Sequence, residues 1–392
     1  MNTTASPVLF ETLAAGNGKK LGLATLNAEK TLNALSMDMV ELLAQQLTEW
    51  RDDASIALVV LQASGEKAFC AGGDLQNLYQ SMLEHHASSE KNNVLGNPYA
   101  LRFFEEEYRL DYLIHTYRKP ILCWGHGIVM GGGIGLMAGA SHRVVTEKSR
   151  LAMPEIAIGL YPDVGGSWFL NRMPGKLGLF LALTGASINA SDACFVKLAD
   201  YQLHHAEKPR LISSLRAQDW SENDEENHKL LSTTLEAAQQ HSAFEAGPLR
   251  QHFDLINQLC AGARLEDIVA QITGLQSEDA WLQKAVAALT KGSPGSAFIA
   301  HALQSGCKHL SLAEVFRLEL GVSLACAAGS DFAEGIRALI IDKDMQPRWN
   351  PAQLLDIPED FEQQFFNSPW DAASHPLRDL AACPAPDKRL AA

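Results

Sequence analysis

Short apolar runs alternate with polar turns along the first half of the chain. Five of them are bounded by turn residues and have the length of strands, at residues 8–13, 21–26, 56–61, 120–124 and 143–146. Residues 36–51 instead follow a helical pattern, with Leu47 and Trp50 on the apolar face. Ser36 can cap the first turn of this helix. Strands that alternate with helices in this way predict an α/β fold with a mainly open sheet.

The pattern changes after about residue 205, where helical periodicity replaces strand-like runs up to about residue 340. The clearest helical segments are 211–218, 227–240, 265–275 and 280–289. The polar stretch 85–97 is typical of a surface loop, and the Pro- and Ala-rich end of the chain is typical of a poorly ordered tail. The sequence therefore predicts three parts: an α/β core over residues 1–204, a helical region over 205–375 and a tail over 376–392.

One helical segment of the second half is strongly apolar. It contains Leu312, Val315, Phe316, Leu318 and Leu320. A cluster of this kind needs a partner surface, because large apolar patches are rarely left in water. This favours a helical region that folds back over the core, and over any pocket there, rather than a separate domain.

Composition and charge narrow the class of protein. The formal net charge is −14 over 392 residues, which argues against nucleic-acid binding because such proteins cluster basic residues. The seven cysteines are scattered without C-x-x-C pairs, which fits reduced thiols better than a disulfide framework. No apolar run reaches the length of a membrane span, and the N-terminus shows no apolar signal core. We therefore expect a soluble cytoplasmic protein that binds neither nucleic acid nor a membrane.

Two glycine-rich turns are the most informative feature. Five of the ten residues from 130 to 139 are glycine, and this segment closely follows the apolar run 120–124. A second glycine pair, in residues 71–74, follows the run 56–61. Glycines at strand-to-helix turns can merely relieve crowding, but they also let unpaired N–H groups approach a ligand. Two such turns could direct two N–H donors, one from Ala71 or its neighbour, at a single acyl oxyanion.

A dinucleotide site is the rival interpretation of the second turn. Residues 133–138 match the form G-x-G-x-x-A, and Glu155 lies 20 residues after Gly135. The match is weak, because such motifs recur by chance in glycine-rich helix starts. It also leaves residues 71–74 unexplained.

Acidic residues near these turns are the candidates for proton transfer. Glu155 and Asp163 lie among apolar and turn residues, where a charged group usually has a partner or a task. A carboxyl group in a dry pocket has a raised proton affinity, which suits a general acid or base. Each also has a structural interpretation: Glu155 could support a turn begun by Pro154, and Asp163 could cap a helix near Gly165.

Other catalytic motifs find no support. The histidines show no metal-ligand spacing, and neither a G-x-S-x-G elbow nor a P-loop occurs. The acidic run 105–107 lies in a helical pattern from 99 to 117 and, taken alone, indicates a solvated helix face. A metal site and a serine triad are therefore disfavoured.

At these residues the chain resembles the crotonase (enoyl-CoA hydratase/isomerase) superfamily. Residues 68–74, 125–133 and 153–159 match its three signature segments in order, within a resemblance that covers about residues 8 to 200. The 3-hydroxyisobutyryl-CoA hydrolase branch is the most similar, on residues 106–108, 161–166, 175–185 and 331–349. The resemblance implies a crotonase-like spiral of ββα units with a long helical C-terminal region, and makes residues 1–204 the catalytic core.

The resemblance also implies a role for each matching residue. The N–H groups of Ala71 and Gly132 would form the oxyanion hole, and Glu155 matches the catalytic glutamate. Glu107 matches an acid that contacts substrate, against its interpretation as part of a solvated face. A second hydratase glutamate would fall at Gly135, which has no carboxylate, whereas Asp163 stands where hydratases usually carry glycine.

The implied reaction is thioester hydrolysis, of 3-hydroxyisobutyryl-CoA to 3-hydroxyisobutyrate and CoA in valine catabolism. Glu155 would either attack the carbonyl or activate water, and residues alone do not choose between these. We expect no metal or redox cofactor, because CoA arrives as part of the acyl-CoA substrate. Lys30 is a candidate partner for the CoA phosphates, and superfamily members often form trimers, so a homo-oligomer stays open. The alternatives are an enoyl-CoA hydratase or isomerase, and a non-catalytic acyl-CoA-binding protein.

Overall fold

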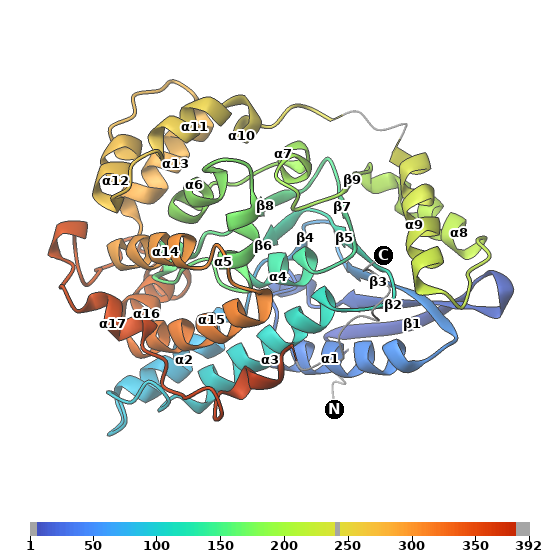
Figure 1. Cartoon of the computed structure of the whole chain (residues 1–392), viewed down its shortest axis with the longest axis horizontal. Helices are drawn as coiled ribbons and strands as arrows, with labels where there is room; N and C mark the ends of the chain where they lie inside the picture. The colour runs from blue at the N-terminus through green and yellow to red at the C-terminus, as the bar shows by residue number, and fades with distance from the viewer. Residues whose placement is uncertain (1–5, 240–243, 382–392) are drawn as a thin grey trace.

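The computed structural model describes residues 6–239 and 244–381. Its centre is a six-stranded sheet in which β1 pairs antiparallel with β2 and all other neighbours are parallel (Figure 1). In spatial order its strands are β1 (Val8–Ala14), β2 (Lys20–Leu26), β3 (Ile56–Ala63), β5 (Ile121–Gly125), β7 (His142–Val145) and β9 (Tyr201–Gln202). The expected α/β fold with an open sheet is confirmed.

A second, three-stranded parallel sheet lies beside the first. It consists of β4 (Ala68–Cys70), β6 (Ile128–Met130) and β8 (Arg150–Ala152). The chain runs from a strand of the large sheet to one of the small sheet and then into a helical segment, three times over. This repeat is the expected spiral of ββα units. The glycine-rich turns therefore follow adjacent short strands, which brings them to one end of the small sheet.

The three longest helices of the core begin at a residue whose side chain caps them. The core helices are α1 (Met37–Asp52), α2 (Leu75–His86), α3 (Pro98–His115), α4 (Gly132–Ala138), α5 (Gly166–Phe169), α6 (Leu177–Thr184) and α7 (Ala190–Phe195). Ser36, Asp74 and Asn97 each accept a backbone N–H at the start of α1, α2 and α3. Such caps satisfy N–H groups that have no partner within the helix.

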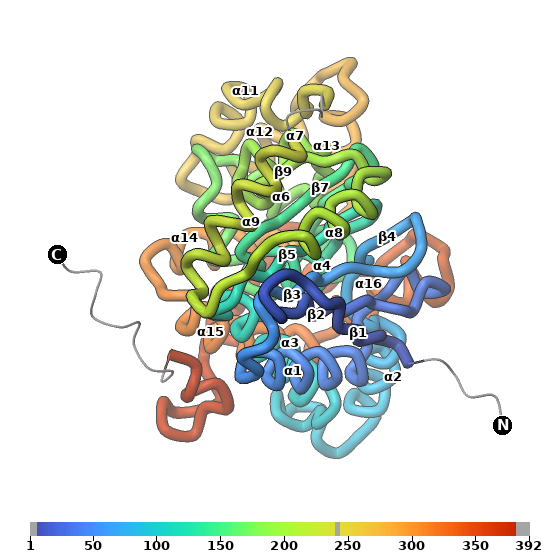
Figure 2. Tube along the Cα trace, turned by 90° about the vertical axis from the view of Figure 1, so that its right-hand side faces the viewer, coloured from blue at the N-terminus to red at the C-terminus, as the bar shows by residue number. Residues whose placement is uncertain are grey.

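The helical region divides over two faces of the core. Its helices are α8 (Lys208–Arg216), α9 (Asp224–Gln239), α10 (Pro248–Gln251), α11 (Phe253–Leu259), α12 (Leu265–Thr273), α13 (Ala280–Lys291), α14 (Pro294–Gly306), α15 (Leu312–Ala328), α16 (Ser330–Ile336) and α17 (Phe361–Phe366). Helices α8 and α9 cover the large sheet, with Trp124 and Trp220 in the core between them (Figure 2). No strand occurs among the described residues after β9, as expected.

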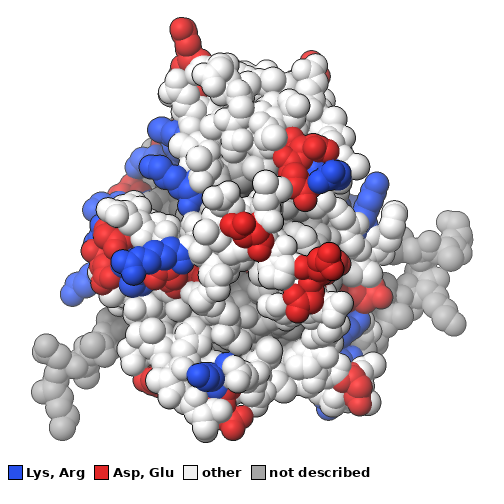
Figure 3. Space-filling model, turned by 90° about the vertical axis from the view of Figure 1, so that its left-hand side faces the viewer, with Lys and Arg blue, Asp and Glu red and all other residues white. Residues whose placement is uncertain are grey.

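Helix α15 shows that the helical region is no separate domain. Its Phe316 ring lies 5.5 Å from the Tyr108 ring of α3, and its buried apolar residues belong to the same core as those of β1. The prediction that the apolar segment 312–320 folds back onto the core is confirmed. On the face drawn in Figure 3, charged side chains of both signs lie in small separate groups on a largely uncharged surface.

The end of the described chain differs from the expectation. Residues 376–381 were expected to belong to a poorly ordered tail, but Pro376–Asp379 form a short helix in which Leu377 is fully buried. Arg109 of α3 holds this segment through Asp379, at 2.9 Å. Apolar burial and an ion pair thus outweigh the Pro- and Ala-rich composition; residues 382–392 lie outside the described residues.

Candidate active site

All five candidate site residues line one narrow cavity, of about 70 Å³. They are Ala71, Glu107, Gly132, Glu155 and Asp163. The ends of β4, β6 and β8 carry three of them to this place, helix α3 brings the acid at 107, and the loop after η3 (Glu155–Ile158) brings the acid at 163. The site expected from the sequence is therefore one place in the fold.

The first glycine-rich turn corrects one expected donor. The Ala71 N–H donates to the Leu32 carbonyl at 3.1 Å, so it is not free for a ligand. The Gly72 carbonyl and the Asp74 N–H are bound by Leu35, at 2.8 and 3.0 Å. Among the described residues, neither the Gly72 N–H nor the Gly73 N–H has a hydrogen-bond partner. The free donors of this turn thus lie one and two residues beyond Ala71.

The second turn supplies Gly132, the first residue of α4. An N–H at this position has no partner within the helix. A β-carbon on Gly132 would lie 3.6 Å from the Gly73 nitrogen, so the two nitrogens are at most about 6 Å apart. That separation allows two donors to stand about 3 Å from one oxygen. The preceding Gly131 has φ of 49°, which favours glycine.

Glu155 lines this cavity, and one of its two carboxyl oxygens has no partner in the described part of the chain. It is buried, and among the described residues its Oε2 accepts no hydrogen bond. A β-carbon on Gly131 would lie 3.0 Å from Glu155 Oε1, so the missing side chain makes room for the carboxylate. Burial, and then the charge of Asp163, raise the pKa of Glu155 well above its ordinary value. The carboxylate does not cap a turn.

Asp163 lies in the turn that leads to α5. Its Oδ2 accepts a hydrogen bond from the Tyr108 hydroxyl at 2.8 Å. Burial raises the pKa of Asp163 to about 6, although the Tyr108 hydrogen bond lowers it. The helix cap is Gly165, so the interpretation of Asp163 as a cap is wrong. Val164 has φ of 51°, a left-handed conformation that is strained for a β-branched residue.

Glu107 lies on the buried face of α3, and the solvated-face interpretation is therefore wrong for this residue. Only 3 % of it is exposed, and a β-carbon on Gly132 would lie 2.5 Å from its Oε1. Burial, followed by the charge of Asp163, raises the pKa of Glu107 well above its ordinary value. Its neighbours Glu105 and Glu106 are partly exposed.

Two further buried acids were missed in the sequence. Asp111 follows Glu107 by one turn of α3, and neither of its oxygens has a partner among the described residues. A β-carbon on Gly135 would lie 2.7 Å from Asp111 Oδ2, so this glycine makes room for the acid. Glu319 of α15 is fully buried and accepts N–H groups from Gly165 and Ser167, at 2.7 and 3.0 Å. An acid in an apolar helix was the available signal, but its target cannot be seen without the fold.

The site is therefore a cluster of buried acids. Burial comes first among the causes that raise the pKa of each, and neighbouring carboxylates add to it for all but Asp163. Among the described residues, no lysine or arginine lines the cavity. Like charges at this range cannot all be ionised, so the cluster holds protons near neutral pH. A buried cavity with free N–H donors and stored protons suits acyl-group chemistry.

Comparison with known proteins shows the family of the chain. The sequence pattern described as enoyl-CoA hydratase/isomerase matches residues 21–366.

The chain belongs to the enoyl-CoA hydratase/isomerase family.

Among relatives, the chain is 37 % identical over 367 residues to the protein of Danio rerio named "3-hydroxyisobutyryl-CoA hydrolase, mitochondrial", covering 93 % of this chain and 90 % of that one. The human protein of the same name is 36 % identical over 351 residues, which is 88 % of this chain and 86 % of that one. The resemblance predicted from the three signature segments is confirmed.

Two solved structures of the family match nearly the whole chain. An enoyl-CoA hydratase from Rhodobacter sphaeroides 2.4.1 is 33 % identical with a TM-score of 0.79, covering 93 % of this chain and 98 % of that one. A carnitinyl-CoA dehydratase from Mycobacterium thermoresistibile has the same identity and TM-score over 94 % and 98 %. Membership of this family also removes support for the dinucleotide interpretation.

The relatives correct the expected location. They are named as mitochondrial proteins, so the prediction of a cytoplasmic protein is wrong. Its main argument was the scattered cysteines, and the six described ones are indeed unpaired. Unpaired thiols indicate a reducing environment but do not distinguish one reducing compartment from another. No helix in the described part of the chain has both the length and the apolar character needed to cross a bilayer.

Proposed function

We propose that the protein hydrolyses the thioester bond of a short branched 3-hydroxyacyl-CoA, with 3-hydroxyisobutyryl-CoA as the best candidate. Relatives of that name, 35–39 % identical over most of the chain, support the choice of substrate. The cavity supports a short acyl group, since about 70 Å³ is far below the 300–1,000 Å³ of typical ligand pockets.

One observation carries the proposal: Glu155, one of whose oxygens has no partner among the described residues, lines the same cavity as Gly73 and Gly132, two residues with free N–H groups. We assign Gly73 and Gly132 as the donors that bind the thioester carbonyl oxygen. Negative charge develops on that oxygen as the tetrahedral intermediate forms, and each donor contributes roughly 3–4 kcal/mol to its stabilisation. Because the side chains around the site are buried, the effective dielectric constant there is lower than in bulk water, and each donor is worth more.

Glu155 is the proposed catalytic carboxylate. It either attacks the carbonyl carbon, giving an anhydride that water then opens, or takes a proton from the attacking water. Both routes add one water to the thioester and yield a carboxylic acid and CoA thiol. The raised pKa makes Glu155 a stronger base than an exposed glutamate once it is ionised.

The remaining acids have complementary roles in this proposal. Asp163 protonates the departing thiolate, and Glu107 binds the hydroxyl of the acyl group. Both lie against Gly132 and Glu155 in the same cavity. Lys30 is exposed, two residues from Leu32, whose carbonyl holds the turn that carries Gly73. It is our candidate contact for a CoA phosphate.

A hydratase is the second candidate, because solved structures with that title share the fold. Gly135 carries no carboxylate. Asp111, which fills the adjacent space, is absent from the cavity lining. Hydration by two carboxylates at the substrate therefore has less support than hydrolysis. A non-catalytic binding protein has less support still, since binding needs neither an unpartnered Glu155 nor Asp163.

The test is release of CoA thiol from a panel of acyl-CoA thioesters. We expect the highest rate with 3-hydroxyisobutyryl-CoA, and a loss of about 1,000-fold in kcat for Glu155→Gln, in the range of general acid–base catalysis. Glu106→Gln is the matched control, from a partly exposed neighbour of Glu107, and should leave kcat unchanged. Hydration of crotonyl-CoA without thiol release would favour the hydratase, and an equal rate in Glu155→Gln would refute the site.

A further inference from the structure

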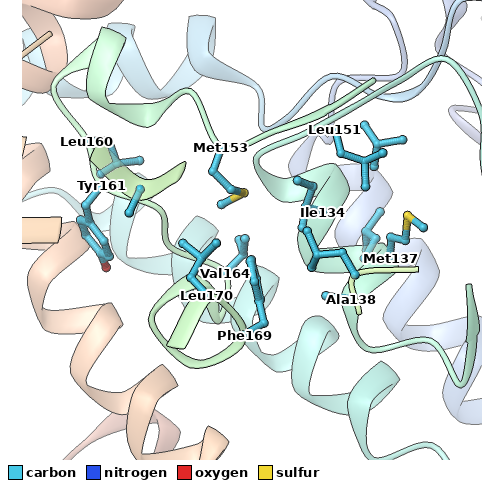
Figure 4. Packing of buried hydrophobic residues seen from close by; sticks show 14 of the residues in the cluster. Ile134, Met137, Ala138, Leu151, Met153, Leu160, Tyr161, Val164, Phe169 and Leu170 are labelled. Carbon is cyan, nitrogen blue, oxygen red and sulfur yellow. The ribbon is translucent and has the colours of Figure 1, made fainter. Parts of the chain in front are cut away.

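Three buried hydroxyl groups connect Asp163 with helix α15. The Tyr108 hydroxyl lies 2.8 Å from Asp163 Oδ2 and 2.7 Å from Ser323 Oγ. The Tyr161 hydroxyl lies 2.8 Å from Ser323 Oγ and 2.9 Å from the Glu319 carbonyl oxygen. In Figure 4 the Tyr161 hydroxyl points away from the apolar cluster, toward the helices of the C-terminal region. The three hydroxyl-bearing residues are fully buried, so water does not complete the chain of contacts.

The number of protons in this chain of hydroxyl groups decides which protonation state of Asp163 is preferred. Each hydroxyl carries one proton, and the Glu319 carbonyl can only accept. If Asp163 is ionised, it too can only accept, and three protons must serve four contacts. If Asp163 is protonated, it donates to the Tyr108 hydroxyl instead of accepting from it as the ionised form does. Four protons then serve four contacts, and every bond runs from Asp163 toward Glu319. A buried contact between two lone pairs is costly, so the complete chain is favoured.

We propose that Ser323 and Tyr161 of this chain hold Asp163 in its protonated form, so that Asp163 can give a proton to the departing sulfur. Both are positioning residues, because neither lines the cavity. In the step, the O–H bond of Asp163 breaks and an S–H bond forms on the thiolate. The proton that the attacking water gives up then restores the acid. The sulfur as acceptor rests on the proposed function; the protonation of Asp163 is a property of the fold without substrate.

Among the described residues, no cation interacts with Asp163. The titratable groups that interact with it come from α3, η3, α15 and its own loop, and none is a cation. They are Glu107, Tyr108, Asp111, Glu155, Tyr161, Glu319 and Cys326. An ionised Asp163 would therefore have the Tyr108 hydroxyl as its main stabilising contact.

Helix α15 also fixes the backbone on which Asp163 stands. The next residue, Val164, is held at φ of 51°. The Glu319 carboxylate accepts the N–H groups of Gly165 and Ser167, which follow directly. A strained conformation persists only where its surroundings determine it, and here they come from the helical region. The same helix thus determines both the position and the protonation state of Asp163.

The proton count predicts what removal of a hydroxyl does. In Tyr161→Phe, the contacts that remain with an ionised Asp163 are Ser323 to Tyr108 and Tyr108 to Asp163, and the two hydroxyl protons serve both. In Ser323→Ala, the Tyr108 proton serves the one contact that remains at Asp163. Both variants make the ionised form complete, so the titration midpoint of Asp163 should fall by about one pH unit, the worth of one hydrogen bond to a charged group. Ser323→Thr, which keeps a hydroxyl, should restore the midpoint.

The measurement is infrared absorption of the protonated carboxyl group, followed against pH on the full chain without substrate. The band of Asp163 is the one that disappears in Asp163→Asn. Ser296→Ala is the matched control, because Ser296 is a buried serine of α14 whose hydroxyl has no partner among the described residues. Tyr117→Phe controls for loss of a buried phenol that binds elsewhere, on the Leu47 carbonyl. Neither control should move the midpoint.

The outcomes separate this proposal from the proposed function. A lower midpoint in Tyr161→Phe and Ser323→Ala supports the hydroxyl chain, even if no acyl-CoA is hydrolysed. An unchanged midpoint in Tyr161→Phe overturns it, whether or not Ser323→Ala folds. If thiol release does occur, its loss at high pH should shift with the infrared midpoint. If Ser323→Ala lowers kcat but does not shift the titration midpoint of Asp163, Ser323 contributes only to packing.

Discussion

The α/β core and the helical region contribute to the site in different ways. The core supplies the groups that would touch substrate: Gly73, Gly132, Glu107, Glu155 and Asp163. The helical region adds only Phe332 to the cavity lining. Its helix α15 nevertheless binds the backbone that follows Asp163 through the Glu319 carboxylate. Its Ser323 hydroxyl contacts Tyr108, the hydrogen-bond partner of Asp163. The acid Asp163 and the residue Glu319 that supports its turn are thus more than 150 positions apart in the sequence. The residues that face substrate therefore do not define the site by themselves.

The largest difference between the two regions is expected when one glycine in each is replaced by alanine. In Gly132→Ala the new β-carbon would lie 2.5 Å from Glu107 Oε1, so the donor or the acid must move. We expect kcat for thiol release to fall by about 100- to 1,000-fold, as for loss of an oxyanion donor. The melting temperature should change little.

Gly306→Ala is the control from the helical region. No atom lies within 4 Å of a β-carbon at this position, so both kcat and stability should stay the same or improve slightly. Equal activity of Gly132→Ala and the wild type would show that the core does not supply the oxyanion site.

The dependence of stability on pH separates the buried acids of the two regions. Burial raises the pKa of Asp163 to about 6 and that of Glu319 to about 8. The folded protein therefore binds more protons than the unfolded chain between these values and pH 4, and the free energy of unfolding should fall as pH rises. For Asp163, the change from 3.8 to about 6 corresponds to about 3 kcal/mol.

Urea unfolding at pH 5, 6, 7 and 8 measures this dependence. Asp163→Asn should flatten the part of the profile below pH 6, and Glu319→Gln should flatten the whole profile from pH 5 to 8. Exposed acids with lowered pKa values, such as Asp52, Asp344 and Asp371, affect stability in the opposite direction, but only at lower pH. Stability that rises from pH 5 to 8 would contradict the raised pKa values.

Glu319→Gln at a single pH tests the support that the helical region provides. The amide keeps one acceptor, so either Gly165 or Ser167 loses its partner for a buried N–H. One unsatisfied buried group costs about 1–3 kcal/mol, and the strained Val164 is then less firmly held. We expect a lower melting temperature together with a loss of about tenfold in kcat. Glu314→Gln, at the exposed start of the same helix, should change neither.

How much the sequence could predict also differs between the regions. The glycine-rich turns, Glu155 and Asp163 were visible because acids and glycines stand out in apolar runs. The Gly73 donor was not visible, because the partner of Ala71 is Leu32, in a loop about 40 residues earlier. Hydrogen-bond partners of this kind depend on tertiary packing.

The helical region shows the same limit more clearly. Its helices, and the apolar segment that packs against α3, follow from periodicity. Glu319 and Ser323 lie within that apolar helix and carry no local signal of a partner. Their contacts on Tyr108 and Gly165 join segments far apart in sequence, so only the fold reveals them.

The smallest expected effect concerns Lys30, at the edge of the core. This side chain is exposed, and an exposed ion pair contributes about 0.2–1 kcal/mol. Lys30→Ala should therefore raise KM for the acyl-CoA by about two- to fivefold at low salt and leave kcat unchanged. The effect should disappear at high salt, because screening weakens exposed charges, and with an acyl-pantetheine, which has no phosphates. Lys20→Ala, at another exposed lysine of the core, is the control. An equal rise in KM for acyl-pantetheine would show that Lys30 acts on the fold and not on a phosphate. Residues other than Lys30 would then bind the nucleotide end of CoA.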